Sequence, residues 1–375
     1  MAHAYTPGLK VTERVLVKKR RILPLKGEVI VKVGDKVNPE DVVARTHLPG
    51  NVVPINVANK LGIPPEDMAE IMVKKVGDPI KEGEMIALKK SFIKFFNTPC
   101  EATVDGTMES VSSVTGQVLQ RGHPIPVEVK AYVQGEITEV FENEGVEVSC
   151  YASFLQGIFG IGGETNGVIK VVTPDNKAIL DDSLITDDLS GKIIIGGSLV
   201  TADAFNKAIK VGVKGVVVGG LDDKDLRDFL GYDIGVAITG SEDIGTTLVI
   251  TEGFGQINMA SKTFELMKRH EGETASINGA TQIRAGVLRP EVVIPAVGEQ
   301  QAVKDEAPSD MSGLVAGTPI RVIRHPYFGH LGTVTSLPSP LQKLESESMA
   351  RVLEVEFDSG EKAIIPRANV EMIED

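Results

Sequence analysis

The feature that most restricts the fold of this chain is a pattern of alternating apolar and polar residues near its C-terminus. Ile320 and Val322 alternate with polar neighbours, and a second alternating stretch covers residues 351–357. Alternation with a period of two is typical of half-buried strands. Turn-forming residues at 326–330 and 358–360 separate these strands from the ones that follow. The segment therefore predicts a small domain built of β-hairpins.

Residues 317–334, Gly-Thr-Pro-Ile-Arg-Val-Ile-Arg-His-Pro-Tyr-Phe-Gly-His-Leu-Gly-Thr-Val, resemble a KOW motif. The resemblance implies an SH3-like barrel in which a strand, a loop at 326–330 and the motif glycine Gly332 follow one another. Ile320, Val322 and Ile323 are then the candidates to face the barrel core. The resemblance covers most of 317–375, with an apparent loop insertion at 337–349.

Proteins with KOW motifs contact RNA, ribosomes or RNA polymerase, as ribosomal proteins and the NusG class of transcription factors do. The resemblance therefore implies a partner-binding role for side chains around the motif loop. Acidic residues outnumber basic ones in this segment, so a protein partner is as good an interpretation as a nucleic acid. The two aromatic side chains either pack within the loop or stack on bases. The candidates are Arg321, Arg324, His325, Tyr327, Phe328 and His330.

Composition limits the kinds of protein that this chain can be. With 375 residues, 42% of them apolar, it is long enough for two or three domains with filled cores. The formal net charge of −13 argues against a general nucleic-acid-binding surface, so any such surface must be local. Cys100 and Cys150 belong to no Cys-x-x-Cys pair or Cys/His cluster, which argues against a disulfide framework and a zinc site. Neither an apolar signal core nor a membrane-length run is present, and we expect a cytoplasmic protein.

Two stretches of the N-terminal region look like copies of each other, residues 31–45 and 73–88. Each has an apolar strand, a Gly-Asp pair, an apolar residue, turn residues, an acidic residue and an apolar pair. Gly34 and Gly77 permit a tight turn in which the acidic side chain binds backbone amides. The pattern, with a further stretch at 98–118, resembles barrel-sandwich hybrid folds such as biotinyl and lipoyl carriers. The resemblance implies a β-rich N-terminal domain.

A carrier domain displays one lysine at a hairpin tip, flanked by Met in biotinyl domains or by Asp and Ala in lipoyl domains. The available lysines, Lys89, Lys90 and Lys94, lack those neighbours. We therefore expect no attached cofactor.

The most concentrated positive charge in the chain is a run of four basic residues on a predicted strand. One interpretation is a solvated strand edge, where lysines discourage aggregation. The alternative is a local patch that follows the phosphates of RNA or DNA. The residues are Lys18, Lys19, Arg20 and Arg21.

The central region, residues 153–297, alternates apolar strands with helical stretches, which predicts an α/β domain with a mostly parallel sheet. Thr201 is placed to cap a helix at 201–210, and further helices are expected at 222–230 and 260–270. Each strand ends in glycines, and open α/β sheets bind ligands at these ends. Close helix-to-strand packing is the other reason for such glycines. The ligand-binding candidates are Gly196, Gly197, Ser198, Gly219, Gly220, Glu252, Gly253, Gly255, Gln256 and Arg284.

Catalytic motifs do not support an enzyme. The sequence has no Gly-x-Ser-x-Gly elbow and no His-Glu-x-x-His, and His270 falls at a helix end where a cation suits the dipole. Pairs of aspartates at 181–182, 187–188 and 222–223 suit helix caps better than magnesium ligands. We therefore expect neither a metal nor a catalytic residue, although the sequence leaves catalysis open.

The complete prediction is a multidomain α+β protein. It comprises a β-rich barrel-sandwich-like domain at 1–152, an α/β domain at 153–297, a flexible linker at 298–316 and a KOW-like barrel at 317–375. The favoured function is a non-catalytic cytoplasmic adaptor whose barrel docks on an RNA-, ribosome- or RNA-polymerase-associated partner. An enzyme or sensor for a small phosphorylated ligand and a self-assembling, homo-oligomeric structural protein remain the alternatives. No membrane contact is expected.

Overall fold

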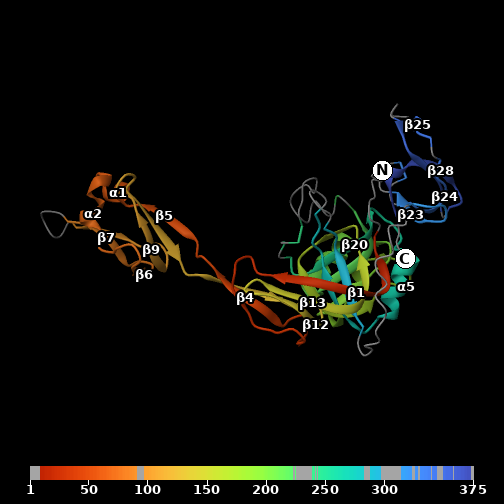
Figure 1. Ribbon diagram of the computed structural model, residues 1–375, viewed down its shortest axis with the longest axis horizontal. Coiled ribbons are helices and arrows are strands. Elements are labelled where there is room, and N and C mark those ends of the chain that lie inside the picture. Colours follow the sequence, from red (N-terminus) through yellow and green to blue (C-terminus); the bar gives the residue numbers. More distant parts are fainter. Residues whose placement is uncertain are drawn as a thin grey trace.

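The computed structural model of the chain describes residues 9–90, 97–222, 224, 239–240, 242, 244–282, 288–296, 314–322, 326–327, 330–338, 340–343, 349–357 and 359–372. The protein is rich in strands and contains a large mixed sheet, in agreement with the predicted α+β class. Figure 1 shows three regions: a central body, an arm that ends in a distal lobe, and a C-terminal lobe. Of the helices in the described ranges, none is both long enough and apolar enough to cross a membrane.

The body is built on a mixed sheet of 13 strands among the described residues. Four parallel strands form its middle: β15 (Glu164–Val171), β17 (Lys192–Ile195), β19 (Gly215–Leu221) and β20 (Thr247–Phe254). β14 (Phe159–Ile161) and β21 (Thr274–Asn278) flank them in antiparallel orientation, and β22 (Glu291–Pro295) follows β21. The short strands β16 (Ile179–Leu180) and β18 (Leu199–Val200) extend the parallel part.

The parallel strands are continuous apolar runs because both faces of the sheet are covered. Helix α3 (Ala202–Val211) packs on one face and α5 (Ser261–Arg269) on the other. The predicted cap is confirmed, since Thr201 accepts a hydrogen bond from the amide of Ala204. Asp181 likewise caps the short helix η3 (Asp182–Leu184), which precedes η4 (Asp187–Leu189). The predicted helix at 222–230 lies mostly outside the described residues.

One long strand joins the N-terminal and central regions into a single sheet. β13 (Gly145–Gln156) pairs with β12 (Gly135–Phe141) along its first half and with β22 along its second half. β1 (Val11–Ile22) pairs with β13 along its other edge, and β3 (Lys36–Val37) adds to β12. This strand crosses residue 152, where the sequence placed a domain boundary.

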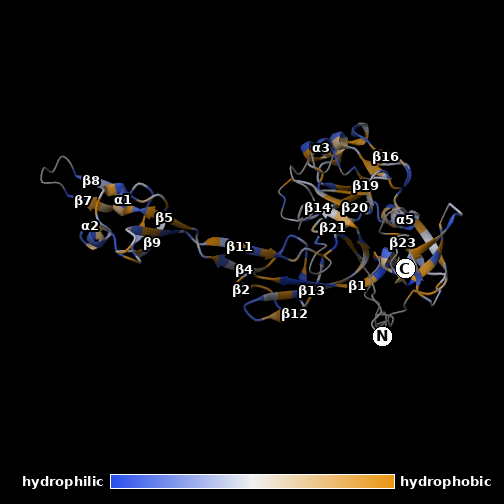
Figure 2. Ribbon diagram, turned by 90° about the horizontal axis from the view of Figure 1, so that it is seen from above, coloured by the Kyte–Doolittle hydropathy of each residue, from blue (hydrophilic) through white to orange (hydrophobic). Residues whose placement is uncertain are grey.

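The arm begins with a stem of two antiparallel strands, β4 (Val42–Leu48) and β11 (Ile125–Lys130), with β2 (Glu28–Val29) beside β4. The distal lobe, residues 49–124, is inserted between the two stem strands. It extends away from the body in both views (Figures 1 and 2).

The distal lobe contains a four-stranded sheet, a strand pair and short helices around a core of its own, which includes Met68, Ile86 and Met108. The sheet has the order β5 (Val52–Asn56), β10 (Gln117–Gly122), β9 (Gly106–Val111) and β6 (Pro79–Ile80). The other elements are β7 (Met85–Lys89), β8 (Thr98–Glu101), α1 (Val57–Leu61), η1 (Pro65–Asp67) and α2 (Met68–Ile71).

The C-terminal lobe is a five-stranded antiparallel sheet with its own core, which includes Ile320 and Val322 as expected. Its strands are β23 (Pro319–Val322), β24 (Leu331–Ser336), β27 (Val352–Phe357), β28 (Lys362–Pro366) and β29 (Val370–Met372). β25 (Gln342–Lys343) and β26 (Met349–Ala350) form a separate hairpin, and η6 (Arg367–Asn369) precedes β29. Gly332 has no room for a side chain, since a Cβ there would lie 2.6 Å from Val355 Cγ1.

Candidate functional site

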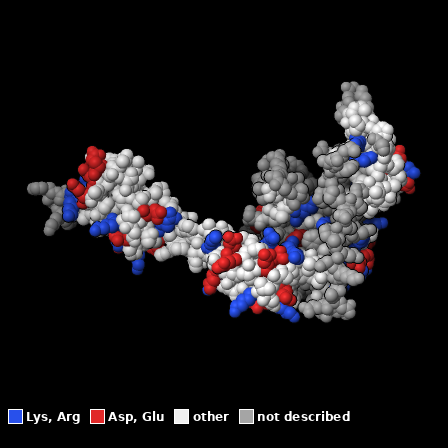
Figure 3. Space-filling view, viewed as in Figure 1, with Lys and Arg blue, Asp and Glu red and all other residues white. Residues whose placement is uncertain are grey.

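The four basic residues of the run at 18–21, on β1, are each paired with a carboxylate. On one face of the strand, Lys18 and Arg20 lie 3.4 and 3.7 Å from the carboxylate oxygens of Glu147. On the opposite face, Lys19 pairs with Glu291 and Arg21 with Glu164, at 2.5 and 2.6 Å. Successive side chains of a strand point to opposite faces, which is why the run divides in this way. Its charge is therefore largely compensated within the protein, and Figure 3 shows basic and acidic side chains interspersed on the visible surface.

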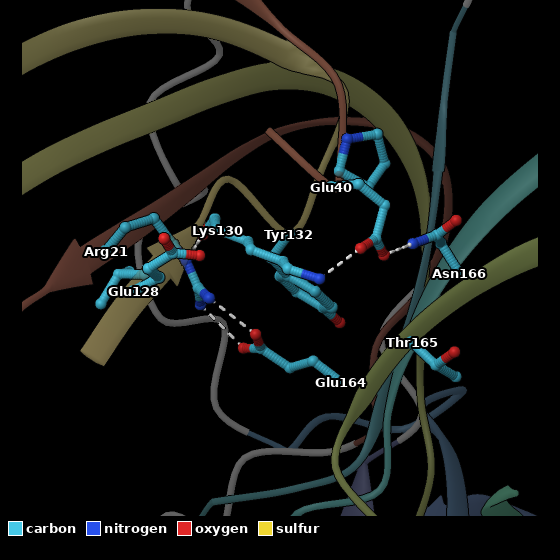
Figure 4. A pocket seen from close by; sticks show the side chains of 10 residues that line it. Arg21, Glu40, Glu128, Lys130, Tyr132, Glu164, Thr165 and Asn166 are labelled. Carbon is cyan, nitrogen blue, oxygen red and sulfur yellow. Dashed lines mark hydrogen bonds and ion pairs between the residues drawn. The ribbon is translucent and has the colours of Figure 1, made fainter. Parts of the chain in front are cut away.

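Arg21 belongs to a cleft of about 250 Å³ where the stem meets the body, which we call the stem-base cleft (Figure 4). Its guanidinium donates two hydrogen bonds to Glu164, of 2.7 and 2.6 Å, and its Nε donates to the carbonyl of Lys130 at 2.7 Å. The Lys130 ammonium lies 2.5 Å from Glu40, which also accepts a hydrogen bond from the Asn166 amide at 2.5 Å. These five side chains come from β1, β15, the stem and the loop before β4.

The buried Tyr132, two residues after the stem strand β11, forms part of this cleft. Its φ of 69° is unusual for a residue other than glycine, and such conformations persist only where the surroundings hold them. Its amide donates to Pro39 O at 2.9 Å, its carbonyl accepts from Ser276 Oγ at 2.6 Å, and its hydroxyl donates to Glu291 at 3.2 Å. Three hydrogen bonds thus fix Tyr132 at the point where the chain passes from the stem into the body.

The hydrogen bond between Glu40 and Lys130 in the cleft stabilises the ionised form of each side chain. The hydrogen bond from Lys130 holds the pKa of Glu40 below its ordinary value, and the same contact raises the pKa of Lys130. Burial raises the pKa of Tyr132 well above its ordinary value, so the ring stays neutral. Because guanidinium, ammonium and carboxylates already satisfy one another, the arrangement is suited to fixing the direction of the stem.

Main-chain atoms occupy the space beside three of the glycines at the ends of the parallel strands, whereas Gly255 has open space beside it. A Cβ at Gly197 would lie 2.3 Å from Ala178 O, and one at Gly219 would lie 2.2 Å from Ile257 O. A Cβ at Gly220 would meet Gly255 O at 2.0 Å.

The remaining ligand candidates are engaged nearby. Gly196 packs on Leu180, Ser198 Oγ donates to Lys177 O at 2.7 Å, and Gln256 contacts that hydroxyl. Gly253 pairs with Gly220 in the sheet, and Arg284 lies outside the described residues. This geometry favours the packing interpretation of the glycines.

Two residues predicted for different sites meet in one buried ion pair. Arg321 on β23 and Glu252 on β20 are 4% and 1% exposed, and the guanidinium binds both the carboxylate and the carbonyl of Thr251, the latter at 3.1 Å. The other carboxylate oxygen of Glu252 accepts from the amide of Ala260, just before α5. β23 turns Ile320 and Val322 into the core of the C-terminal lobe and Arg321 toward the body. The contact therefore anchors the lobe to the body.

The loop of the C-terminal lobe has an aromatic cluster in its described part. The rings of Tyr327 and His330 lie 5.1 and 5.2 Å from that of Phe357. Tyr327 thus packs within the lobe, which was one of its two interpretations. Arg324, His325 and Phe328 lie outside the described residues.

One arrangement of polar side chains was not found from the sequence. Ser153 Oγ lies 2.8 Å from His270 Nε2, and His270 Nδ1 lies 2.8 Å from Glu273. This is the order of a Ser-His-acid triad, but Ser153 is 4% exposed and its hydroxyl donates to Glu13 O at 2.6 Å. The hydroxyl proton is thus directed at a main-chain carbonyl and not at the imidazole, so the group is not arranged to activate a serine nucleophile. The three side chains fasten the end of α5 to the sheet.

No group of three or more metal-ligating side chains occurs among the residues that the structure describes. The chain matches no protein-family model, and no curated protein matches it.

Proposed function

We propose that the protein is a non-catalytic scaffold that holds two binding lobes in fixed positions on one body. The observation that carries this proposal is the stem-base cleft, where Arg21, Lys130 and Glu40 join residues far apart in the sequence around the root of the arm. Five hydrogen-bonded side chains and one constrained tyrosine at this point are more than a passive connection requires. A fixed arm is useful where the distal lobe must reach a partner at a defined place.

The C-terminal lobe serves in this proposal as the KOW-like barrel that docks on an RNA-, ribosome- or RNA-polymerase-associated partner. Contact with a protein of that assembly is favoured over contact with nucleic acid. Arg321, the first basic residue of the motif, is buried against Glu252, and the four cations of the basic run on β1 pair with three carboxylates. At these two places the cations are already engaged by carboxylates, which weakens the phosphate contacts that dominate nucleic-acid affinity.

The distal lobe is the part to which the proposed barrel-sandwich hybrid architecture applies, without a carrier lysine. We place the protein in the cytoplasm with no cofactor. The ligand-binding alternative has less support than the scaffold, because backbone atoms occupy the space beside Gly197, Gly219 and Gly220.

Purification from the native host, with and without ribonuclease, tests this function. We expect the partner to remain bound after the RNA is digested, and to remain with the Lys18→Ala/Arg20→Ala variant, whose two exposed cations already pair with Glu147. Loss of the partner on digestion, or a steep loss with salt that the variant abolishes, would show a nucleic-acid contact and contradict the proposal.

A further inference from the structure

The two copied stretches of the sequence form turns with the same pair of hydrogen bonds. In the first, the amide of Lys32 donates to the Asp35 carboxylate at 2.8 Å, and the amide of Asp35 donates to Lys32 O at 3.1 Å. In the second, Lys75 and Asp78 make the same two bonds at 2.7 and 3.0 Å. Gly34 and Gly77 take φ values of 91° and 88°. The first turn lies on the body beside β12 and the second lies on the distal lobe beside β9, so we call them the proximal tip and the distal tip.

The tips also agree in what they expose. Val33 and Val76 are 62% and 61% exposed, and Ile30 and Val73, three residues before each valine, are 44% and 49% exposed. Lys32 and Lys75 are exposed, and neither forms an ion pair with another residue that the structure describes. Each tip therefore presents two aliphatic side chains and one uncompensated ammonium.

The turn itself does not require these residues, because the same turn occurs three more times among the residues that the structure describes. Residues 38–41, 81–84 and 315–318 repeat the bond from the first amide to the fourth side chain, at 2.7, 3.0 and 3.1 Å. Their first two positions hold Asn-Pro, Lys-Glu and Val-Ala. The pair Lys-Val occurs at the proximal and distal tips alone among these five turns, at positions that pack against no core. Folding explains the shared glycine and aspartate, but not the shared lysine and valine.

We propose that the proximal and distal tips are two equivalent docking points for one protein partner. That partner presents two copies of an apolar pocket rimmed by carboxylates, as a two-fold symmetric dimer does. Exposed aliphatic side chains beside an unpaired cation suit such a pocket, because the valine fills it and the lysine meets its acidic rim. A phosphate backbone would use the lysines but leave four aliphatic side chains in water.

Site-specific photocrosslinking in the native host tests the proposal. Val33 and Val76 are replaced, one at a time, by p-benzoylphenylalanine, with Val114 as the matched control because it is 85% exposed on another turn of the distal lobe. We expect the same protein to be crosslinked from both tips and not from the control. Different proteins at the two tips, a nucleic acid, a second copy of the chain, or no crosslink at all would each overturn the proposal.

The protein crosslinked from both tips is then purified and titrated with the full-length chain. Val33→Asp and Val76→Asp each convert a two-point contact into a one-point contact, so each lowers the affinity by about 100-fold or more. The exposed positions keep both variants folded, which circular dichroism verifies. Glu82→Lys, at the equivalent position of the 81–84 turn, is the matched control and leaves the affinity unchanged. An equal loss in this control, or no loss in either tip variant, would contradict paired docking.

Discussion

The buried ion pair between Arg321 and Glu252 gives a direct test of what holds the C-terminal lobe to the body. Glu252→Gln removes the charge but keeps an oxygen that accepts from Ala260, so the start of α5 retains its hydrogen bond. Arg321 is then left in a buried position without its carboxylate. Breaking one side of a buried ion pair costs about 3–5 kcal/mol. At about 1.4 kcal/mol for each factor of ten, the ratio of docked to undocked lobe falls by roughly 100-fold to several thousand-fold.

The expected result is a C-terminal lobe that leaves the body while both remain folded. The cores of the two regions are separate, since no residue of the lobe belongs to any of the three core clusters of the body among the described residues. Small-angle X-ray scattering should therefore show a larger radius of gyration, while circular dichroism keeps the native strand signal.

The double variant Glu252→Gln/Arg321→Met is the control for this prediction. The double variant removes both charges, so it leaves no uncompensated buried charge, which is the cause of the cost when one side alone is changed. The double variant should recover the compact radius of gyration. A Glu252→Gln variant with unchanged scattering, or a double variant as extended as the single one, would refute the reasoning.

Three further predictions follow from the cleft and the buried groups. The pKa of Glu40 is lowered in the folded protein. The ionised carboxylate therefore stabilises the fold fully above its ordinary pKa of 4.5, and this stabilisation is lost as the pH falls through the lower pKa of the folded state. The Glu40→Gln variant should be less stable at neutral pH than the wild type, and its free energy of unfolding should depend less on pH in this window. Ser153→Ala removes the hydroxyl between His270 and Glu13 and should lower the free energy of unfolding by about 1–3 kcal/mol in urea titrations, while a fluorophosphonate probe should fail to label Ser153 in the wild type; labelling would show a nucleophile. Gly219→Ala should destabilise the body by several kcal/mol, because its Cβ meets main-chain atoms at 2.2 Å; an unchanged melting temperature would show that the turn has room.

Local features of the fold could be predicted from the sequence because neighbouring residues determine them. The cap at Thr201, the turns at Gly34 and Gly77, and the alternation of Ile320 and Val322 all depend on contacts within a few residues or on a fixed period. Each of these expectations is confirmed.

The contacts of the site could not be predicted in the same way, because they join residues that only the topology brings together. Glu252 and Arg321 are 69 residues apart, and Glu40 and Lys130 are 90 apart. From the sequence, Arg321 is a basic residue in a motif and Glu252 a polar residue after a strand. Neither pattern indicates that each is the other's partner.

The central claim is that the arm has a fixed direction relative to the body. The distribution of distances between the distal lobe and the body tests this claim directly. Spin labels are placed on Lys60→Cys in the distal lobe and on Asn206→Cys on α3, with Cys100 and Cys150 replaced by alanine. Pulsed electron paramagnetic resonance then gives the distribution of distances between the two labels. We predict a single narrow distribution that broadens in Arg21→Ala/Glu40→Ala and stays narrow in Lys18→Ala/Arg20→Ala, the matched pair on the other face of β1. A broad distribution in the protein with the cleft intact would contradict a fixed arm.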